Sequence, residues 1–271
     1  MILKHDIPQG AKLYFGKEAK IKREIENIAA EVFEALEFEE IVTPFFSYHQ
    51  LEALDEKELI RFTDDKNRSL ALRGDSSIDV IRLVIKRLKS EAKKWFYIQP
   101  VFRAPSSEMY QIGAEWLDGN LVDILKTNNL IFERLNKSYT LQLSHIKIPQ
   151  KVAELTGLDI EDIKKMRLYK FDDVWLKKLV AIHSVKDLDN LDMFPNEIAG
   201  YLKELKEVAK HFENAIIAPL YVANLRYYTG VFYRFLKDNT VYAKGGEYVV
   251  EGERSVGFSI YTDNLLKDIN G

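Results

Sequence analysis

A run of aromatic residues and the glycine-containing segments after it are the first part of this chain to suggest chemistry. The run Leu225–Tyr233 holds the adjacent tyrosines Tyr227 and Tyr228, among residue types that favour strands. The segments Gly245–Tyr248 and Ser255–Ser259 follow it. Glycine lets other groups approach the backbone closely, so the pattern predicts either the floor of a ligand pocket or an ordinary hairpin. Neighbouring strand residues point to opposite faces, so we expect only one of the two tyrosines to face a given cavity.

A second candidate lies in a strand predicted over Met109–Leu117. With a period of two, Gln111, Gly113 and Glu115 share one face of this strand, and the other face is apolar. A buried carboxylate needs a polar partner, whereas water satisfies a carboxylate on an exposed face. The pattern alone fits a polar site and an exposed face equally well.

The elements that must position these side chains follow from periodicity. Residues 18–36 carry apolar side chains at three- and four-residue steps, which predicts an amphipathic helix. A strand is predicted over Glu40–Thr43, ending at Pro44. A hairpin is expected over residues 60–72, before a helix cap at Asp75. Further strands are predicted at residues 95–103, 216–217 and 241–243, and further helix at residues 121–145.

Short helices replace this pattern from about residue 150 to residue 212, with breaks at Gly157, Pro195 and Gly200. We expect a small helical insertion that flanks the sheet. The predicted fold class is α+β, with a mixed, mainly antiparallel sheet of about six strands flanked by helices. Residues 1–271 are expected to form a single domain that contains the insertion.

Composition excludes several classes of protein. The net charge of −3 argues against a dominant nucleic-acid surface. There is no cysteine, which excludes disulfides and thiolate metal sites, and the five histidines lack the spacing of metal ligands. No apolar stretch approaches the length of a membrane span, and the first residues are too polar for a signal peptide. We therefore expect a cytoplasmic protein without a metal or cofactor.

Taken in order, these segments resemble the class II aminoacyl-tRNA synthetase core and, within it, the histidyl-tRNA synthetase branch. Leu225–Gly230 resembles the Leu-Asp-Tyr-Tyr-Thr-Gly signature of that branch. Glu40–Pro44 resembles class II motif 1, Phe102-Arg103 with the Gln111 to Glu115 strand resembles motif 2, and Ser255–Leu265 resembles motif 3. The resemblance extends from about Asp6 to Leu266 and is weakest over residues 150–212.

The resemblance implies a pocket for free histidine, formed by Asp75, Arg103, Gln111, Glu115, Tyr227 and Tyr228. The ligand's ammonium would donate to Asp75 and to the side-chain carbonyl of Gln111. Its carboxylate would bind the guanidinium of Arg103. Its imidazole would lie between Glu115 and the hydroxyl of Tyr228.

Positions that serve amino-acid activation in those synthetases are changed here. The arginine that stabilises developing charge corresponds to Ala223, and the motif 3 arginine that binds the ATP triphosphate corresponds to Asn264. The motif 2 loop arginine is replaced within Ser106-Ser107, and the Gly-Gly-Arg-Tyr-Asp segment corresponds to Gly245–Val249. Loss of one preorganised charge-stabilising group costs about two to three orders of magnitude in rate, so we expect no catalysis.

An amino-acid pocket beside a changed activation site is typical of the synthetase-like regulatory subunits of ATP phosphoribosyltransferase. In that family the chain ends after motif 3 without an anticodon-binding domain, and Asp75 in place of the synthetase glutamate also fits it. The resemblance implies a non-catalytic partner of a short ATP phosphoribosyltransferase catalytic subunit. Its role would be to support the first step of histidine biosynthesis and to mediate feedback inhibition by histidine.

Motif 1 implies a homodimer, and no tRNA is expected as a partner. Two other readings stay open at this point. The chain could be a histidine-activating or tRNA-modifying synthetase paralogue, which Ala223 and Asn264 oppose. It could also be a scaffold whose pocket is vestigial.

Overall fold

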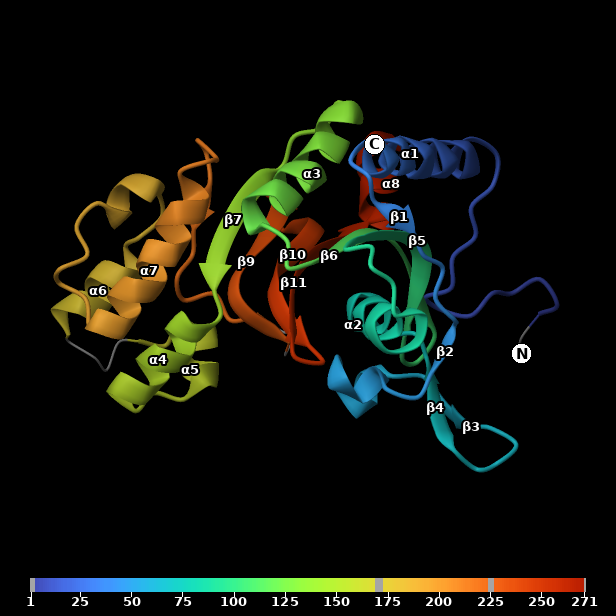
Figure 1. Cartoon of the computed structure of the whole chain (residues 1–271), viewed down its shortest axis with the longest axis horizontal. Helices are drawn as coiled ribbons and strands as arrows, with labels where there is room; N and C mark the ends of the chain where they lie inside the picture. The colour runs from blue at the N-terminus through green and yellow to red at the C-terminus, as the bar shows by residue number, and fades with distance from the viewer. Residues whose placement is uncertain (1–2, 169–172, 224–226, 271) are drawn as a thin grey trace.

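A large twisted sheet is the centre of the computed structural model, which describes residues 3–168, 173–223 and 227–270 (Figure 1). Within those residues it has eight strands in the order β1-β5-β6-β11-β10-β9-β7-β8. β1 is parallel to β5 and β7 is parallel to β8, and the other neighbours are antiparallel. The strands are Glu39–Glu40 (β1), Lys94–Arg103 (β5), Ser107–Leu117 (β6), Thr140–His145 (β7), Ile216–Ile217 (β8), Tyr228–Lys237 (β9), Thr240–Val250 (β10) and Glu253–Tyr261 (β11).

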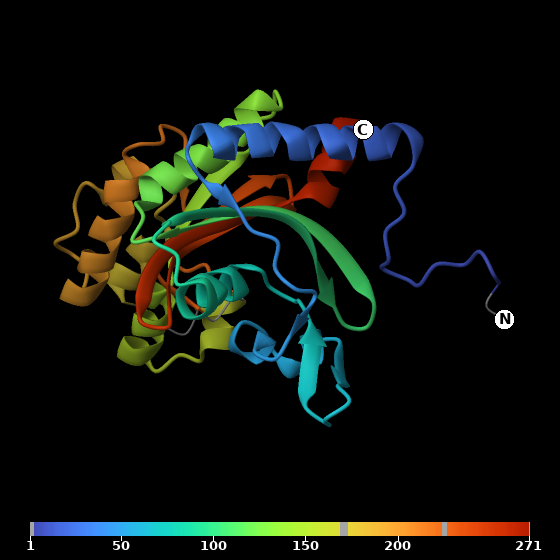
Figure 2. The same ribbon diagram turned by 45° about the vertical axis from the view of Figure 1, so that its right-hand side comes forward.

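Helices cover the two faces of this sheet unequally. Figures 1 and 2 show α1, α3 and α8 together on one face and α2 against the other. The helices before the insertion and at the end of the chain are Gly16–Ala35 (α1), Ser77–Arg82 (α2), Leu121–Arg134 (α3) and Thr262–Asn270 (α8). A π-helical turn, Leu83–Leu88, continues α2. The two faces therefore form separate cores.

Strand alternation explains the two cores. In β5 and β6, side chains such as Phe96 and Ile112 join the larger cluster beneath α1 and α3. Their neighbours Trp95 and Tyr97 join a smaller cluster with α2, as do Tyr228 and Tyr248. Because successive strand residues point to opposite faces, the polar face predicted for Gln111 and Glu115 lies on the α2 side.

A small three-stranded sheet extends from the α2 side. It pairs Phe46–Ser47 (β2) with Ser69–Leu72 (β4), and β4 with Arg61–Thr63 (β3). The hairpin expected over residues 60–72 is therefore present. Two 3₁₀ turns, Gln50–Glu52 and Glu56–Glu58, lie between β2 and β3.

The helical insertion lies between the parallel strands β7 and β8. Its elements are Lys147–Thr156 (α4), Ile160–Lys164 (α5), Val174–Val180 (α6), the 3₁₀ turn Val185–Leu188 and Asn196–Ala209 (α7). Gly157 ends α4 in the left-handed conformation at φ 72°, as its break signal predicts. Side chains of these helices share the larger hydrophobic cluster with the sheet. That the whole chain is one domain stays a prediction, which this shared core supports.

Two predicted elements were wrong at their ends. The helix expected over residues 121–145 stops at Arg134, because Asn136 adopts a positive φ of 54° and residues 140–145 form β7. Leu141 and Leu143 alternate with Thr140, Gln142 and Ser144, which is a strand period, but the prediction extended the preceding helix over it. The strand expected over Glu40–Thr43 is only β1, because the Thr43 amide donates to the Gln99 side chain at 3.1 Å instead of continuing the ladder.

Candidate functional site

A polar cavity opens on the α2 face, above the middle of the sheet. It is lined by Asp75, Ser77, Arg103, Gln111, Tyr227, Tyr228, Lys244, Tyr248, Gly257, Phe258, Ser259 and Tyr261. These residues come from the start of α2 and the loop before it, from β5, β6, β9, β10 and β11, and from the segment just before β9. The cavity thus brings together segments that are far apart in the chain.

Glycines in adjacent strands make room for this cavity. A side chain at Gly257 would collide with the carboxylate of Glu115, and one at Gly113 would collide with the ring of Tyr97. The Tyr97 hydroxyl is then free to pair with Ser259 Oγ at 2.7 Å. Small residues at these positions let large polar side chains lie flat across the strands.

Glu115 is fully buried at the base of the site. Its Oε2 accepts a hydrogen bond from the Tyr248 hydroxyl, and its Oε1 has no hydrogen-bond partner. Burial, with a smaller effect of the nearby Asp75 charge, raises the pKa of Glu115 to about 8, against the lowering effect of hydrogen bonds that include those of Ser77 and Tyr248. None of the described cations forms an ion pair with this carboxyl, so the site favours a ligand that donates a hydrogen bond there.

Gln111 supplies a second buried acceptor. Its Oε1 is without a hydrogen-bond partner, although the side chain is only 6% exposed and lines the cavity. A buried acceptor left unpaired costs about 1–3 kcal/mol. Together with Glu115 Oε1, which lies behind the cavity residue Tyr248, this acceptor favours a ligand with more than one N–H donor.

Asp75 lies at the other end of the site, in the turn that starts α2. The Tyr227 hydroxyl donates to Asp75 Oδ2 at 3.4 Å, and the Ile78 amide is 3.4 Å from Oδ1. Burial raises the pKa of Asp75, while the positive charge of Arg103 lowers it. Asp75 and Arg103 are therefore an acceptor and a cation close to each other at the cavity wall.

Two long cationic side chains, Arg103 and Lys244, line the cavity without an acidic partner. Among the residues that the structure describes, neither Arg103 nor Lys244 has a carboxylate oxygen within 4.0 Å, the distance of an ion pair. Lys244 instead lies over the Tyr261 ring, at 5.6 Å from its centroid. Both cations are available to an anionic group of a ligand.

The free space within the cavity is small, about 30 Å³. That is close to the volume of one water molecule in the liquid and far below the roughly 300 Å³ of the smaller ligand pockets. A ligand the size of an amino acid must therefore displace lining side chains. Arg103 and Lys244 can change rotamer without breaking an ion pair.

The structure places five of the six predicted site residues on the cavity wall, with Glu115 directly behind its partner Tyr248. The expectation that only one tyrosine faces the cavity was wrong, because Tyr227 precedes β9 and is not bound by its alternation. The signature residues Leu225 and Arg226 lie outside the described residues.

Sequence reasoning gave no ligand-binding role to several residues of this site, among them Tyr248 and Lys244. It placed the ligand's imidazole between Glu115 and Tyr228 and did not foresee that Tyr248 donates a hydrogen bond to Glu115. The signal was present in the alternation of Lys244, Gly246 and Tyr248, but a bulge between Gly246 and Tyr248 obscures the register.

The positions that differ from an activating site have structural contacts here. Asn264 Nδ2 donates to the backbone oxygen of Val241 at 2.8 Å, and the Ser106 hydroxyl donates to the backbone oxygen of Gln9. Ala223 packs against the smaller core. Glu247 lies on the opposite face and accepts from the Val231 amide at 2.9 Å. None of these four side chains lines the cavity or supplies a cation to it.

The described residues contain neither a metal-binding cluster nor a membrane-spanning helix. No group of three or more histidine, aspartate or glutamate side chains is arranged to hold a metal ion there. None of the described helices is both long and apolar enough to cross a membrane.

Solved structures with the same arrangement are class II synthetase-like. A crystal structure of an ATP phosphoribosyltransferase regulatory subunit/histidyl-tRNA synthetase from Bacillus halodurans covers 100% of this chain and 85% of its own, with a TM-score of 0.87 at 18% identity. Histidyl-tRNA synthetase from S. aureus covers 100% and 74%, with a TM-score of 0.70 at 22% identity. The fold is thus that of the class II histidyl-tRNA synthetase core.

Sequence comparisons define the family more closely. The family model described as Histidyl-tRNA synthetase matches residues 13–265. An ATP phosphoribosyltransferase regulatory subunit of Wolinella succinogenes is 39% identical over 99% of this chain and 97% of the relative. One from Helicobacter hepaticus is 38% identical over 98% and 99%. A histidine–tRNA ligase of Methanococcus aeolicus is 30% identical over 97% and 71%. The chain belongs to the histidyl-tRNA synthetase family and, within it, to the ATP phosphoribosyltransferase regulatory subunits.

Proposed function

We propose that this chain is the non-catalytic regulatory subunit of a short ATP phosphoribosyltransferase and that it binds free histidine in the polar cavity. The observation that carries the ligand assignment is the pair of buried, unpartnered acceptors on Gln111 and Glu115, opposite an unpaired Arg103. Histidine has the complementary groups, an ammonium and an imidazole N–H as donors and a carboxylate as anion.

The arrangement gives histidine one orientation. Its ammonium donates to Asp75 and to Gln111 Oε1, and its carboxylate binds Arg103. Its imidazole lies between Tyr248, Tyr228 and the base of the site, where Glu115 Oε1 accepts a ring N–H. The groups at the two ends then recognise different parts of the ligand.

The regulatory role follows from the relatives' names and from linkage. Histidine that binds one state of the complex better than another shifts the activity of the catalytic partner. The positions that would be cationic in an activating enzyme, Ala223 and Asn264, offer no charge to a triphosphate, which supports a role without catalysis. We expect this role in histidine biosynthesis, in the cytoplasm and without tRNA.

We also propose a homodimer, formed through the surface after β1. This aromatic surface consists of Phe45, Phe46, Tyr48, Leu51 and Phe62, each exposed by more than a third. Phe46 and Phe62 stack edge to face at 5.4 Å. An exposed apolar cluster of this kind is typical of an interaction site, and it directly follows Glu40–Pro44, the segment that resembles motif 1.

Co-purification and calorimetry test the proposal together. A short ATP phosphoribosyltransferase should co-purify with this chain from the native host, and its activity should require the chain and fall when histidine is added. Calorimetry should show histidine binding to the chain alone. No heat and no thermal shift at millimolar histidine would favour a scaffold with a vestigial pocket, and histidine-dependent exchange of pyrophosphate with ATP would identify a synthetase paralogue instead.

A further inference from the structure

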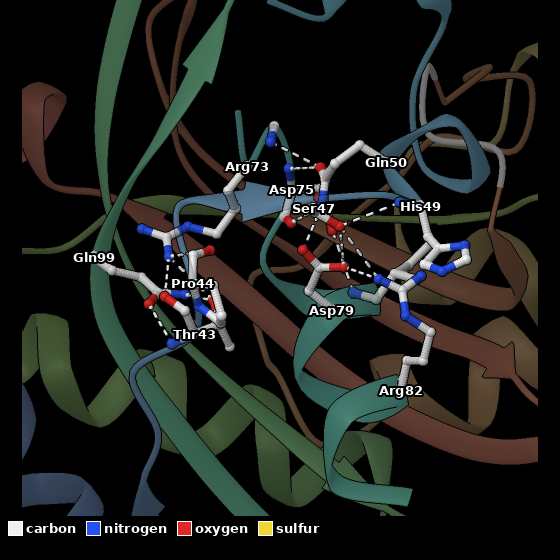
Figure 3. Close-up of polar contacts among 12 residues, drawn as sticks. Thr43, Pro44, Ser47, His49, Gln50, Arg73, Asp75, Asp79, Arg82 and Gln99 are labelled. Carbon is white, nitrogen blue, oxygen red and sulfur yellow. Dashed lines mark hydrogen bonds and ion pairs between the residues drawn. The ribbon is translucent and has the colours of Figure 1, made fainter. Parts of the chain in front are cut away.

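Gln50 lies outside the cavity, and its side-chain amide forms hydrogen bonds with the loop that carries Asp75 (Figure 3). Its Oε1 accepts from the backbone amides of Gly74 and Asp75, both at 2.7 Å. Its Nε2 donates to the Asp75 backbone oxygen at 3.2 Å and to Asp79 Oδ2 at 2.5 Å. The side chain is 3% exposed, so a buried carboxamide has four partners, the number that it can serve.

The partner carboxylate of Gln50 is itself fixed on α2. Asp79 forms an ion pair with Arg82 and accepts a hydrogen bond from the Ser47 hydroxyl at 3.2 Å. On the other side of the loop, the fully buried Arg73 donates to the backbone oxygens of Thr43 and Pro100, each at 2.6 Å. The loop of residues 73–75 is therefore held between these two anchors (Figure 3).

The Asp75 carboxyl has weaker support than its backbone. Its hydrogen bonds from the Tyr227 hydroxyl and the Ile78 amide are both 3.4 Å long, longer than the usual range, and the Ser77 backbone amide is a further donor. By contrast, the hydrogen bonds that Gln50 Oε1 accepts from the Gly74 and Asp75 amides are 2.7 Å long. The position of the carboxyl thus depends mainly on the backbone that Gln50 holds.

We propose that Gln50 is a positioning residue that sets Asp75 for the ammonium group of the bound amino acid and so determines selectivity for amine-bearing ligands. The proposal rests on the proposed histidine site. Gln50 does not touch the ligand. Its effect is confined to the end of the cavity formed by Asp75, while Glu115 and Tyr248 at the other end keep their own contacts.

The test compares three ligands by calorimetry on the full chain. Histidine and histamine carry the ammonium, whereas imidazole-4-propionate has the ring and the carboxylate without it. In Gln50→Met, the affinity for histidine and histamine should fall about tenfold or more, because a shape-similar side chain without polar atoms leaves the loop amides unpaired. The affinity for imidazole-4-propionate should stay within about twofold of wild type.

A matched control and a rescue separate positioning from a loss of folding. Gln142→Met removes another buried glutamine, whose Oε1 accepts a hydrogen bond of 2.6 Å from Arg234. Gln142 does not line the cavity, so this variant should leave the three affinities unchanged. The double variant Gln50→Glu/Asp79→Asn keeps the net charge and reverses the donor between the two side chains. The glutamate introduced at position 50 would still accept from the loop amides but could not donate to the Asp75 backbone oxygen, so the double variant should restore part of the preference for histidine over imidazole-4-propionate, with thermal denaturation confirming that each variant is folded.

The outcomes distinguish this proposal from the proposed function. Equal losses for all three ligands in Gln50→Met, or no loss, would overturn the positioning role while wild-type binding of histidine still stands. A wild-type chain that binds none of the three ligands would overturn the histidine site and the role of Gln50 together.

Discussion

At the scale of single residues, Glu115 has the most unusual environment of the site. The groups around it are the hydroxyls of Tyr248, Tyr97 and Ser77 and the carboxyl of Asp75, none of them cationic. Burial therefore dominates and the pKa of Glu115 rises to about 8. Because this carboxyl is protonated near neutral pH in the folded state, the free energy of unfolding of the protein depends on pH.

We expect the free energy of unfolding to fall as pH rises from about 4.5 to about 8 through the contribution of Glu115. In that window the folded state keeps a proton on Glu115 that the unfolded state has lost, so each pH unit costs up to about 1.4 kcal/mol. The contribution is complete below pH 4.5 and is lost as pH passes the folded pKa. Urea denaturation between pH 5 and pH 9 measures it.

Glu115→Gln should flatten that profile, because a carboxamide does not titrate. The exposed Glu24→Gln serves as control and should keep the wild-type slope. An unchanged slope in Glu115→Gln would show that other groups cause the dependence.

Arg103→Met tests the other end of the site. We expect histidine affinity to fall about ten- to a hundredfold, since hydrogen bonds to charged groups contribute about 1.5–3 kcal/mol. Histamine lacks the carboxylate, so its affinity should change little. Calorimetry with both ligands measures the difference, and Arg134→Met, which removes a surface ion pair to Glu31, is the control. Equal losses for both ligands would mean that Arg103 does not bind the carboxylate.

Residue types and spacing predicted which polar side chains gather at the site, but not each contact. Asp75, Arg103 and Gln111 could be placed because each lies at the end of a predicted element or on a face of one. The partner of Glu115 could not, because the bulge in β10 shifts Tyr248 relative to β9. The two tyrosines were misjudged because Tyr227 lies just before its strand begins.

At the scale of secondary-structure elements, the glycines of the central strands leave space for the polar side chains that lie across the sheet. Gly257→Ala would bring a methyl group into the carboxylate of Glu115. We expect the free energy of unfolding to fall by about 1–3 kcal/mol, the usual cost of overpacking. Chemical denaturation measures this change.

Gly200→Ala gives the opposite expectation for the same substitution. Gly200 lies within α7, and no neighbour lies within 4 Å of the place that a methyl group would take. Alanine favours the helix by about 1 kcal/mol over glycine, so the variant should be more stable than wild type. If both variants changed stability in the same direction, the crowding argument for Gly257 would be wrong.

Strands and helices with clear periodicity were predicted well, and the exceptions have physical causes. α1, the hairpin of β3 and β4, and the paired strands β5 and β6 follow their patterns. β7 was missed although Leu141 and Leu143 alternate with Gln142 and Ser144, because the helical period before it was extended over a strand whose polar side is also buried. The early end of β1 depends on one side chain, Gln99, that replaces a backbone partner.

At the scale of the whole molecule, the aromatic surface gives a prediction about assembly. Phe46 is 60% exposed, so Phe46→Asp should fold and should weaken self-association at least tenfold, because a charge cannot be buried there without a partner. Analytical ultracentrifugation measures the association. Val174→Asp alters another exposed apolar residue, 71% exposed in α6, and should leave association unchanged. Equal association of the two variants would place the interface elsewhere.

The overall architecture could be predicted because motif order survives even where single motifs are weak. The sequence reasoning could not predict how far the cavity is filled, because that depends on how the Arg103, Lys244 and tyrosine side chains pack after folding. Helix boundaries within the insertion were likewise set by local caps such as Asp159, whose carboxylate accepts the Glu161 amide at 2.7 Å.

The insertion leaves the sheet at β7 and returns at β8, the outermost strand on that side. The strands that line the cavity, β5, β6, β11, β10 and β9, lie further along the same sheet, and none of the cavity-lining residues belongs to the insertion. The crossover can therefore be exchanged between relatives, lengthened or shortened at little expense to ligand recognition. Chimaeras that exchange residues 147–215 between relatives would show whether the insertion determines which catalytic subunit binds the chain.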